Sequence, residues 1–208
     1  TIGADNEFFP FSSVGVIPQD LKYSGEDAEL IIGNKNSVRE YCNLSIGTEG
    51  GGMVTKVGDN NLLMVHTHVA HDCIVRDNCI FANGVSLGGH VEVHDGAVLG
   101  GHCAIHQFVK IGTMAMVAGG AMVVQDITPY GMVQGDRAEM RGLNVTGLRR
   151  SKLKSEDVSA IKAMHKIVFG RELTAEKAMG AILAEVAPSP QRDIYLAFLK
   201  ASDRGLCR

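Results

Sequence analysis

Residues 57–128 divide into twelve units of six: VGDNNL, LMVHTH, VAHDCI, VRDNCI, FANGVS, LGGHVE, VHDGAV, LGGHCA, IHQFVK, IGTMAM, VAGGAM and VVQDIT. The first residue of every unit is aliphatic or aromatic: Val57, Leu63, Val69, Val75, Phe81, Leu87, Val93, Leu99, Ile105, Ile111, Val117 and Val123. The fifth residue is nearly always small or β-branched: Asn61, Thr67, Cys73, Cys79, Val85, Val91, Ala97, Cys103, Val109, Ala115, Ala121 and Ile127. A short internal repeat of this kind determines the architecture.

A period of six is typical of a chain that turns a corner after each short strand. Three such faces close a triangular coil, and residues one coil apart then stack at roughly the 4.8 Å spacing of paired strands. The first and fifth positions would fill the interior of the prism. The glycine or alanine that often follows the aliphatic residue suits a turn that needs unusual backbone angles or close approach. The sequence therefore predicts a mainly β protein built on a parallel β-helix.

Composition indicates one or two globular domains and excludes several classes of protein. The chain has 208 residues, a hydrophobic content of 45% and a net charge of −3, which does not favour a nucleic-acid partner. No stretch approaches the roughly 18 apolar residues of a membrane span, and no signal peptide is recognisable. Five cysteines without a CxxC pair favour a cytoplasmic location. Because Thr1 already lies inside a repeat, we expect further coils before it.

The repeat predicts a coil domain over residues 1–130 with two loop insertions, near 16–30 and 47–56. The second insertion contains a triple glycine, and long loops on a regular scaffold are usually functional. An irregular connector is expected over 131–154. A helical C-terminal domain is expected over 155–208, with helices that begin at the caps Ser155, Thr174 and Ser189.

Seven of the eight histidines lie between His66 and His106, and several fall at positions that the repeat turns outward. Stacking at intervals of one coil places Gly89 on His71 and Gln107 on Gly89, while His90 stacks on Asp72. This group suits acyl transfer to a hydroxyl. A neutral histidine can accept a proton at neutral pH, a carboxylate can fix its tautomer, and a backbone N–H at a glycine can stabilise an oxyanion.

Several motifs carry a resemblance to one family. They are QDLKY at 19–23, GTEGGG at 47–52, HVAHDC at 68–73, GGHV at 88–91, HQF at 106–108, GLNV at 142–145 and GLRR at 147–150. In this order they resemble the UDP-N-acetylglucosamine acyltransferase family over essentially the whole chain. The resemblance implies a left-handed coil, although parallel crossovers are generally right-handed.

The resemblance implies transfer of an (R)-3-hydroxyacyl group from acyl carrier protein to the 3-hydroxyl of UDP-GlcNAc, the first step of lipid A synthesis, without a covalent acyl-enzyme. It implies a homotrimer with the site between subunits, and no cofactor or metal. His71 would be the general base, supported by Asp72, with the Gly89 N–H at the oxyanion. The implied substrate-binding residues are Asp20, Lys22, His68, His90, His106, Gln107, Asn144 and Arg150.

Three further points concern single positions. Gly119 matches the residue that limits acyl length in the family, and it stacks on Gly101, so we expect room for a long chain. The family has an acidic residue and a second basic residue where this chain has Thr146 and Ser151. The nucleotide contacts of this chain are therefore expected to differ from those of the family at these two positions. A basic cluster at 149–154 could attract an acidic carrier protein.

Alternative functions remain at this stage. A hexapeptide-repeat carbonic anhydrase would hold zinc with three histidines; His66 and His102 are two coils apart, but the expected third ligand is Gln107. Related enzymes acylate a 3-amino UDP-sugar, and the sequence does not exclude that acceptor. An N-acyltransferase of the same pathway has a large N-terminal domain that this chain does not show. A scaffold without activity is the remaining alternative, and the histidine cluster disfavours it.

Overall fold

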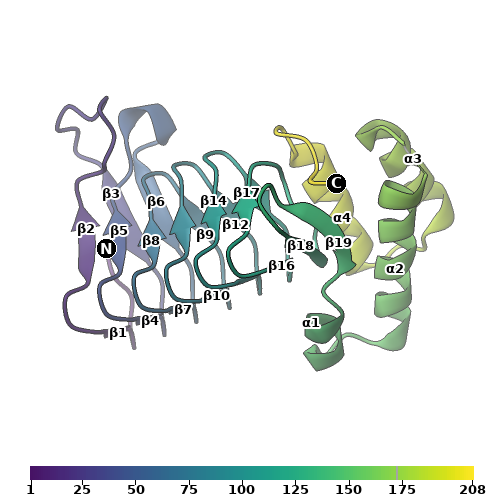
Figure 1. Cartoon of the computed structure of the whole chain (residues 1–208), viewed down its shortest axis with the longest axis horizontal. Helices are drawn as coiled ribbons and strands as arrows, with labels where there is room; N and C mark the ends of the chain where they lie inside the picture. The colour runs from purple at the N-terminus through teal and green to yellow at the C-terminus, as the bar shows by residue number, and fades with distance from the viewer. Residues whose placement is uncertain (172) are drawn as a thin grey trace.

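A computed structural model describes residues 1–171 and 173–208. Three sheets of short strands form the sides of a prism, with a helical part at its C-terminal end (Figure 1). Sheet 1 consists of β1 (Glu7–Phe8), β4 (Ser37–Val38), β7 (Leu62–Leu63), β10 (Ile80–Phe81), β13 (Val98–Leu99), β16 (Met116–Val117), β18 (Gly131–Gln134) and β19 (Glu139–Leu143).

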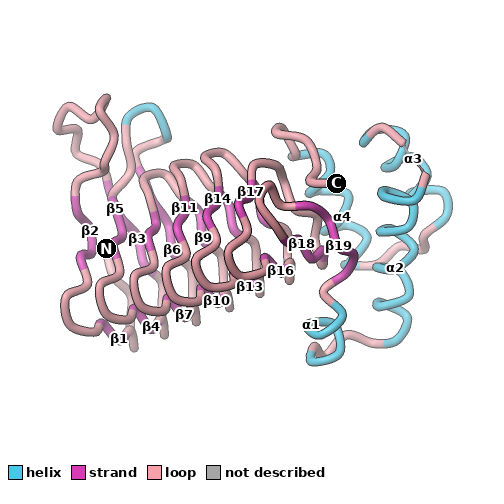
Figure 2. Tube along the Cα trace, in the orientation of Figure 1, coloured by secondary structure: helices cyan, strands magenta, loops and turns pink. Residues whose placement is uncertain are grey.

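The two other sides contain parallel strands alone. Sheet 2 consists of β2 (Ser13–Val16), β5 (Asn43–Ser45), β8 (His68–Val69), β11 (Ser86–Leu87), β14 (Ala104–Ile105) and β17 (Met122–Val123). Sheet 3 consists of β3 (Glu29–Ile32), β6 (Val54–Val57), β9 (Ile74–Val75), β12 (Glu92–Val93) and β15 (Lys110–Ile111). Figure 2 shows that each strand is a short segment between turns.

The register confirms the expected stacking of one coil on the next. His68 pairs with Ser86 and Ser86 with Ala104, each eighteen residues further along the chain. The same interval separates the pairs of sheet 1 and sheet 3 in this region, as in Ile80 with Val98. The interior is as the repeat predicts, because all the first and fifth residues of the twelve units are buried.

The two uses expected of a small turn residue fall at two different positions of the unit. The left-handed conformation occurs at the fourth residue of the unit, as in His66 (φ 61°) and Asp72 (φ 59°). The second-position glycines are needed for close approach, which is one of the two expected reasons. A Cβ on Gly88 would lie 2.8 Å from the backbone nitrogen of Gln107 in the next coil. The repeat thus combines a left-handed residue at one turn position with a small residue at another.

Both loop insertions project from the corner between sheet 2 and sheet 3, along the upper edge of the coil in Figure 1. The first spans 17–28 between β2 and β3. The second spans 46–53 between β5 and β6 and contains the 3₁₀ turn η1 (Glu49–Gly51). The insertions increase the sequence separation of paired residues beyond the regular eighteen. Ser13 pairs with Asn43, and Ser37 pairs with Leu62. The structure thus has two long segments between strands, and they share one corner.

An irregular connector is expected after residue 130, but the structure has two strands there. Strand β18 continues sheet 1 by pairing in parallel with β16, and β19 folds back on it as an antiparallel strand. The short helix α1 (Val145–Arg150) follows. The six-residue period ends before this segment, so the repeat gives no signal for a hairpin that completes the sheet by main-chain pairing.

Three longer helices, α2 (Ser155–Gly170), α3 (Ala175–Glu185) and α4 (Pro190–Ala201), pack on one another around a second core. Thr174 and Ser189 cap α3 and α4 as expected. The cap of α2 is Lys154 rather than Ser155, and the Lys154 N–H donates to the side chain of Asp157 (3.1 Å). Where helices are described, none combines the length and apolar character needed to cross a membrane.

The C-terminal tail returns to the end of the coil. The backbone N–H of Cys207 donates to the carbonyl of Asp126 (2.8 Å), and the Asp126 N–H donates to the carbonyl of Gly205 (2.9 Å). Cys207 is buried in the same core as the coil interior. The tail therefore covers the last coil by strand-like pairing and by one buried side chain.

Candidate functional site

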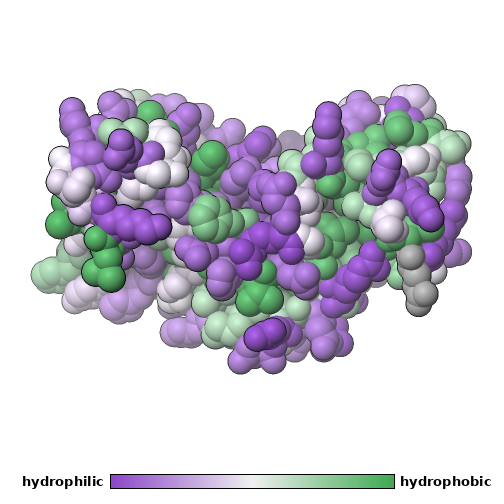
Figure 3. Space-filling model, turned by 90° about the horizontal axis from the view of Figure 1, so that it is seen from above, coloured by the Kyte–Doolittle hydropathy of each residue, from purple (hydrophilic) through white to green (hydrophobic). Residues whose placement is uncertain are grey.

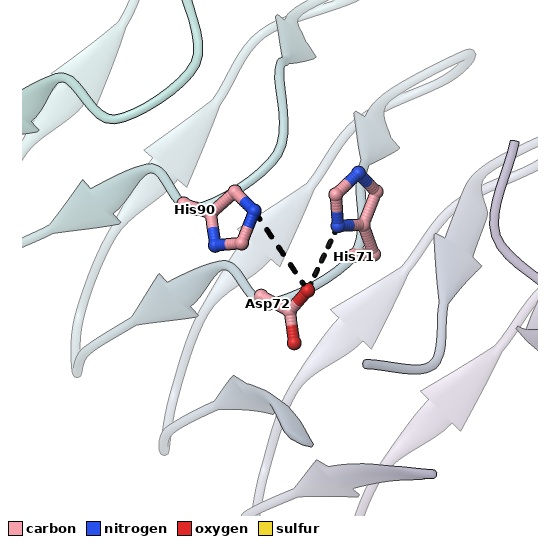
Figure 4. A group of neighbouring side chains, drawn as sticks. All are labelled: His71, Asp72 and His90. Carbon is pink, nitrogen blue, oxygen red and sulfur yellow. Dashed lines mark hydrogen bonds and ion pairs between the residues drawn. The ribbon is translucent and has the colours of Figure 1, made fainter. Parts of the chain in front are cut away.

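His71 and Asp72 lie at the turn between β8 and β9, on the corner that also carries both loop insertions. Nδ1 of His71 is 2.8 Å from Oδ2 of Asp72 (Figure 4). The left-handed φ of 59° at Asp72 sharpens the turn between the two residues. Adjacent residues at such a turn can direct their side chains toward each other, which the alternation of a strand would prevent.

The carboxylate of Asp72 is fully buried under the second loop. The backbone N–H of Thr48 donates to Oδ1 (2.9 Å) and its hydroxyl donates to Oδ2 (2.6 Å). A carboxylate that accepts these bonds also accepts the Nδ1–H of His71. The second ring nitrogen, Nε2, is then the acceptor of a neutral His71. This is the state that a general base requires.

Gly89 lies one coil beyond His71 on the same corner. A Cβ at Gly89 would lie 2.7 Å from Nε2 and 2.5 Å from Cε1 of His71, so a side chain there would collide with the imidazole. The backbone N–H of Gly89 donates to no described residue, while the N–H of His90 donates to the carbonyl of His71 (3.0 Å). The Gly89 backbone therefore packs against the imidazole of His71 and carries an N–H without a partner among the described residues.

His90 stands on the other side of Asp72. Its Nε2 is 4.0 Å from Oδ2 of Asp72, and its ring meets that of His71 edge-on at 5.1 Å. The ring of Phe108 stacks on His90 at 4.3 Å. Burial lowers the pKa of His90 below its ordinary value, and the charge of Asp72 opposes that shift only in part. His90 is therefore expected to be neutral at neutral pH.

His68 precedes this pair on β8 and borders the first of two hollows. Its Nδ1 lies 2.9 Å from Oδ1 of Asn43, and burial lowers its pKa. The first hollow has a volume of about 380 Å³. Its lining includes Gln19, His68, His71, Gly88, Gly89 and Ala104.

The second hollow, of about 350 Å³, lies between the two loops on the side of His90. Its lining residues are Asp20, Lys22, Glu26, Thr48, Glu49, Gly50, His90 and Phe108. Asp20 accepts the backbone N–H of Lys22 (3.0 Å), which fixes the turn that carries both residues. Asp20 and Lys22 thus lie on the site corner, where they line the same hollow as His90.

Gln107 and His106 continue the corner toward the C-terminus. The N–H of Phe108 donates to the carbonyl of Gly89 (3.0 Å), which confirms that Gln107 stacks over Gly89. Both side chains are exposed, and Nδ1 of His106 is 3.1 Å from the carbonyl of Gln107. Seen from above in Figure 3, the surface is largely hydrophilic and is hollowed between the loop end and the helical end.

Asn144 and Arg150 are not brought to this corner by their own chain. Asn144 caps α1 by accepting the N–H of Gly147 (2.9 Å), and it donates to the carbonyl of Met114 (3.0 Å). Met114 lies between β15 and β16, at the corner of sheets 3 and 1. Thr146 and Ser151 belong to the same short segment. Within one chain, the residues expected at the nucleotide are therefore remote from the base.

Gly119 lies at the third corner, between β16 and β17. A Cβ there would be 3.3 Å from the carbonyl oxygen of Gly101, a tight but not prohibitive approach. Gly101 has a comparable 3.3 Å approach to the carbonyl of Asn83. By contrast, a Cβ on Gly100 would meet the nitrogen of Gly119 at 2.5 Å. A side chain would clash with the neighbouring backbone at position 100 but not at position 119. The main effect of glycine at 119 is therefore to leave the surface above it free of a side chain.

The residues of the second loop and of β6 that hold Asp72 are not indicated by the sequence. Thr48 donates to the carboxylate, Thr55 accepts the Asp72 N–H through its hydroxyl (2.8 Å), and Gly51 lies against the carboxylate. The triple glycine was a signal that this loop has a function. The insertion interrupts the repeat, however, and stacking arithmetic cannot assign a partner to a residue outside the repeat.

A metal at the site would need ligands from His71, Asp72 and His90, whose donor atoms lie within 4.8 Å of one another. Their arrangement is better suited to hydrogen bonding, because the carboxylate already accepts two bonds from Thr48 and one from His71. The pair considered for zinc, His66 and His102, lies at the corner of sheets 1 and 2, whereas Gln107 lies at the site corner.

The nearest thiol is not placed to act as a nucleophile. Cys73 follows Asp72 directly but is fully buried in the coil, where its Sγ donates to the carbonyl of Gly88 (3.1 Å). Burial raises the pKa of Cys73 to about 12. The thiolate that a covalent mechanism requires is therefore disfavoured.

Comparisons with known proteins find similar sequences and similar folds. Residues 126–207 match the family model "Udp N-acetylglucosamine O-acyltransferase; Domain 2", and residues 55–89 match "Bacterial transferase hexapeptide (six repeats)". A curated acyl-[acyl-carrier-protein]–UDP-N-acetylglucosamine O-acyltransferase from Aliarcobacter butzleri is 56% identical over 81% of this chain. This chain spans 65% of the length of that relative.

Two further comparisons extend over the whole chain. The enzyme of the same name from Albidiferax ferrireducens is 45% identical over 99% of this chain and 80% of its own length. The crystal structure of LpxA from Acinetobacter baumannii is 42% identical and superposes with a TM-score of 0.96, covering 100% of this chain and 81% of that chain. The expected left-handed β-helix with a helical C-terminal part is confirmed. The division at residues 130 and 154 stays a prediction.

Proposed function

The chain belongs to the UDP-N-acetylglucosamine O-acyltransferase family, and we propose that it transfers an (R)-3-hydroxyacyl group from acyl carrier protein to the 3-hydroxyl of UDP-GlcNAc. This reaction would be the first step of lipid A synthesis. The observation that carries the proposal is the contact of 2.8 Å between His71 and Asp72, with the backbone of Gly89 packed against the same imidazole.

His71 would act as the general base. Its Nε2 takes the proton of the sugar 3-hydroxyl while the oxygen attacks the thioester carbonyl, and Asp72 stabilises the imidazolium that forms. The Gly89 N–H would donate to the carbonyl oxygen as it becomes negative. Collapse of the intermediate expels the carrier thiolate, which takes the proton from His71. The ester bond forms as the thioester breaks, without a covalent acyl-enzyme.

The remaining residues would position the two substrates. His68 borders the hollow beside the base, while Asp20 and Lys22 border the other hollow with His90. We assign these residues to the sugar and to the acyl hydroxyl. His106 and Gln107, further along the corner, would contact the same substrates. The neutral state expected of His68 and His90 is suited to hydrogen bonding with uncharged hydroxyls.

A homotrimer is part of the proposal. Asn144 and Arg150 can reach the nucleotide only if they approach the base from a second copy, because their own chain places them at another corner. Placing the site between neighbouring subunits would also cover the half-buried histidines. The basic residues of 149–154, which adjoin Arg150, would then be available to an acidic carrier protein.

Gly119 is proposed to leave room for a long acyl chain. Its backbone does not require glycine through a left-handed φ, and the stacked Gly101 leaves a second open position. We therefore expect a preference for chains longer than ten carbons. An assay with carrier proteins loaded with chains of different length would contradict this if chains of ten carbons or fewer were clearly preferred.

The direct test is an assay of the purified chain with 3-hydroxyacyl carrier protein and UDP-GlcNAc. The expected product is the nucleotide sugar with one acyl group on the 3-oxygen, identified by mass and by NMR. A His71→Ala protein serves as the negative control. Product only with the 3-amino UDP-sugar would show that the acceptor is an amine and not a hydroxyl. Absence of transfer to either sugar by a folded trimer would contradict the proposed function.

A further inference from the structure

The carboxylate of Asp72 could serve either of two imidazoles. Its Oδ2 lies 2.8 Å from Nδ1 of His71 and 4.0 Å from Nε2 of His90, and the side chain of Asp72 has no exposed surface. A small shift of Oδ2 toward His90 would lengthen its contact with His71 and shorten the one with His90. Something other than the imidazoles must therefore fix its orientation.

Thr48 supplies that constraint. Its backbone N–H binds one carboxylate oxygen at 2.9 Å and its hydroxyl binds the other at 2.6 Å, so both oxygens are held at once. A pair of donors on both oxygens fixes the plane of the carboxylate as well as its position. Thr48 is itself buried, with 5% of its surface exposed, so water cannot readily take its place.

The second loop is shaped for this contact. The carbonyl of Thr48 accepts the N–H groups of Gly51 (3.1 Å) and Met53 (2.9 Å), which closes the loop around it. A Cβ on Gly51 would overlap the carboxyl group of Asp72, so only glycine lets the loop approach so closely. The hydroxyl of Thr55 meanwhile holds the Asp72 backbone at 2.8 Å.

The same loop is joined to the loop that carries Asp20 and Lys22. The side chain of Glu26 accepts the N–H of Glu49 (3.2 Å) on one oxygen and the N–H of Ser24 (2.9 Å) on the other. Glu49 directly follows Thr48. The residues proposed to bind substrate and the residue that holds Asp72 are thus connected through one carboxylate.

We propose that Thr48 is a positioning residue that directs the Asp72 carboxylate to His71 and away from His90, so that Nε2 of His71 is the basic nitrogen. This inference rests on the proposed function for its kinetic readout. Thr48 acts through Asp72 and His71, and it does not itself exchange a proton with the substrate.

The kinetic test compares Thr48→Val, which keeps the shape and removes the hydroxyl, with Thr48→Ser, which keeps the hydroxyl. We expect the kcat of Thr48→Val to fall roughly 10- to 100-fold, as for a lost hydrogen bond to a charged group. The KM for UDP-GlcNAc should stay within about twofold, because only the base is displaced. Thr48→Ser should restore most of the activity.

Thr67→Val is the matched control, because Thr67 is also a fully buried threonine of the coil and its hydroxyl donates only to the carbonyl of Met64 (2.7 Å). Its kcat should remain near that of the unmodified protein. If Thr48→Val does not fold, Gly51→Ala offers a second disturbance of the same carboxylate. A folded Thr48→Val or Gly51→Ala protein with unchanged kcat would overturn the inference, as would a Thr48→Ser protein no more active than Thr48→Val.

A crystal structure of the Thr48→Val protein gives a readout that does not depend on activity. We expect the Nδ1–Oδ2 contact between His71 and Asp72 to open beyond hydrogen-bonding distance, with the carboxylate turned toward His90. An unchanged contact would overturn the inference even if the unmodified protein transferred no acyl group. Failure of the proposed function, by contrast, would appear as an inactive unmodified protein.

Discussion

In the coil, each turn is joined by main-chain hydrogen bonds to the turns before and after it, whereas α2, α3 and α4 pack on one another through side chains such as Ile161, Met164 and Tyr195. The coil therefore fixes atoms at regular intervals along its axis. The N–H of His90 on the carbonyl of His71 is one such bond, and it fixes the spacing between the turns that carry His71 and Gly89. Groups that need a fixed spacing, such as the proposed base and oxyanion donor, therefore lie on the coil, while the helices lie at its end.

The strongest test of this difference removes the side chain of the proposed base from the coil. His71→Ala should lower kcat/KM by about 10²–10⁴-fold, the usual contribution of a general base. The fold should persist, because no main-chain bond is lost. Steady-state kinetics would be combined with circular dichroism and gel filtration. His102→Ala, an exposed histidine at another corner, is the control, and equal activity of the two variants would exclude His71 from the mechanism.

The second test concerns the coil interior. Phe81→Ala removes a fully buried ring and should lower the free energy of unfolding by about 3–5 kcal/mol. Ile80→Ala, on the same strand but 39% exposed, should cost less than about 1 kcal/mol. Urea denaturation would measure both values. Similar losses for the two variants would contradict the assignment of inner and outer positions on β10.

A third test concerns the open surface at Gly119. Gly119→Leu should lower transfer of chains longer than ten carbons at least about tenfold relative to shorter chains, since a filled pocket rejects extra methylenes. The activity with short chains should change little. Competition between carrier proteins loaded with long and short chains would measure the ratio. An unchanged ratio would show that Gly119 does not face the acyl chain.

The smallest effect is expected in the helical part. Burial lowers the pKa of His165 below 6.5, and its Nδ1 has no partner among the described residues. The unfolded chain therefore takes up this proton first as the pH falls, and stability is lost below pH 6.5 by at most about 1.4 kcal/mol per pH unit. His165→Leu should reduce that loss without changing kcat. Denaturation at pH 7.5 and 5.5 would test it, and an unchanged pH dependence would contradict it.

The sequence predicts the coil well because one short period fixes strand position, register and burial together. Stacking at eighteen residues placed Gly89 on His71 and His90 beside Asp72, and the structure has both contacts. The capped helices α3 and α4 were also predictable, because Thr174 and Ser189 are local signals. These features depend on residues close in sequence or on an exact repeat.

Two features were not predictable for a common reason. The hairpin of β18 and β19 and the contact of Thr48 with Asp72 both depend on segments outside the repeat. Their partners are chosen by tertiary packing, and neither a period nor a local cap indicates them. The interruption of the repeat by GTEGGG indicates a functional loop at 47–52, but it does not identify Thr48 as the donor to Asp72.

The unpaired N–H of Gly89 is not unique on its corner. The backbone N–H groups of His71, Gln107 and Gln125, at equivalent turns, also donate to no described residue. The turn geometry therefore leaves a row of free donors at regular steps, whatever the side chains are. If the proposed oxyanion role of Gly89 holds, the scaffold itself offers equivalent donors at His71, Gln107 and Gln125.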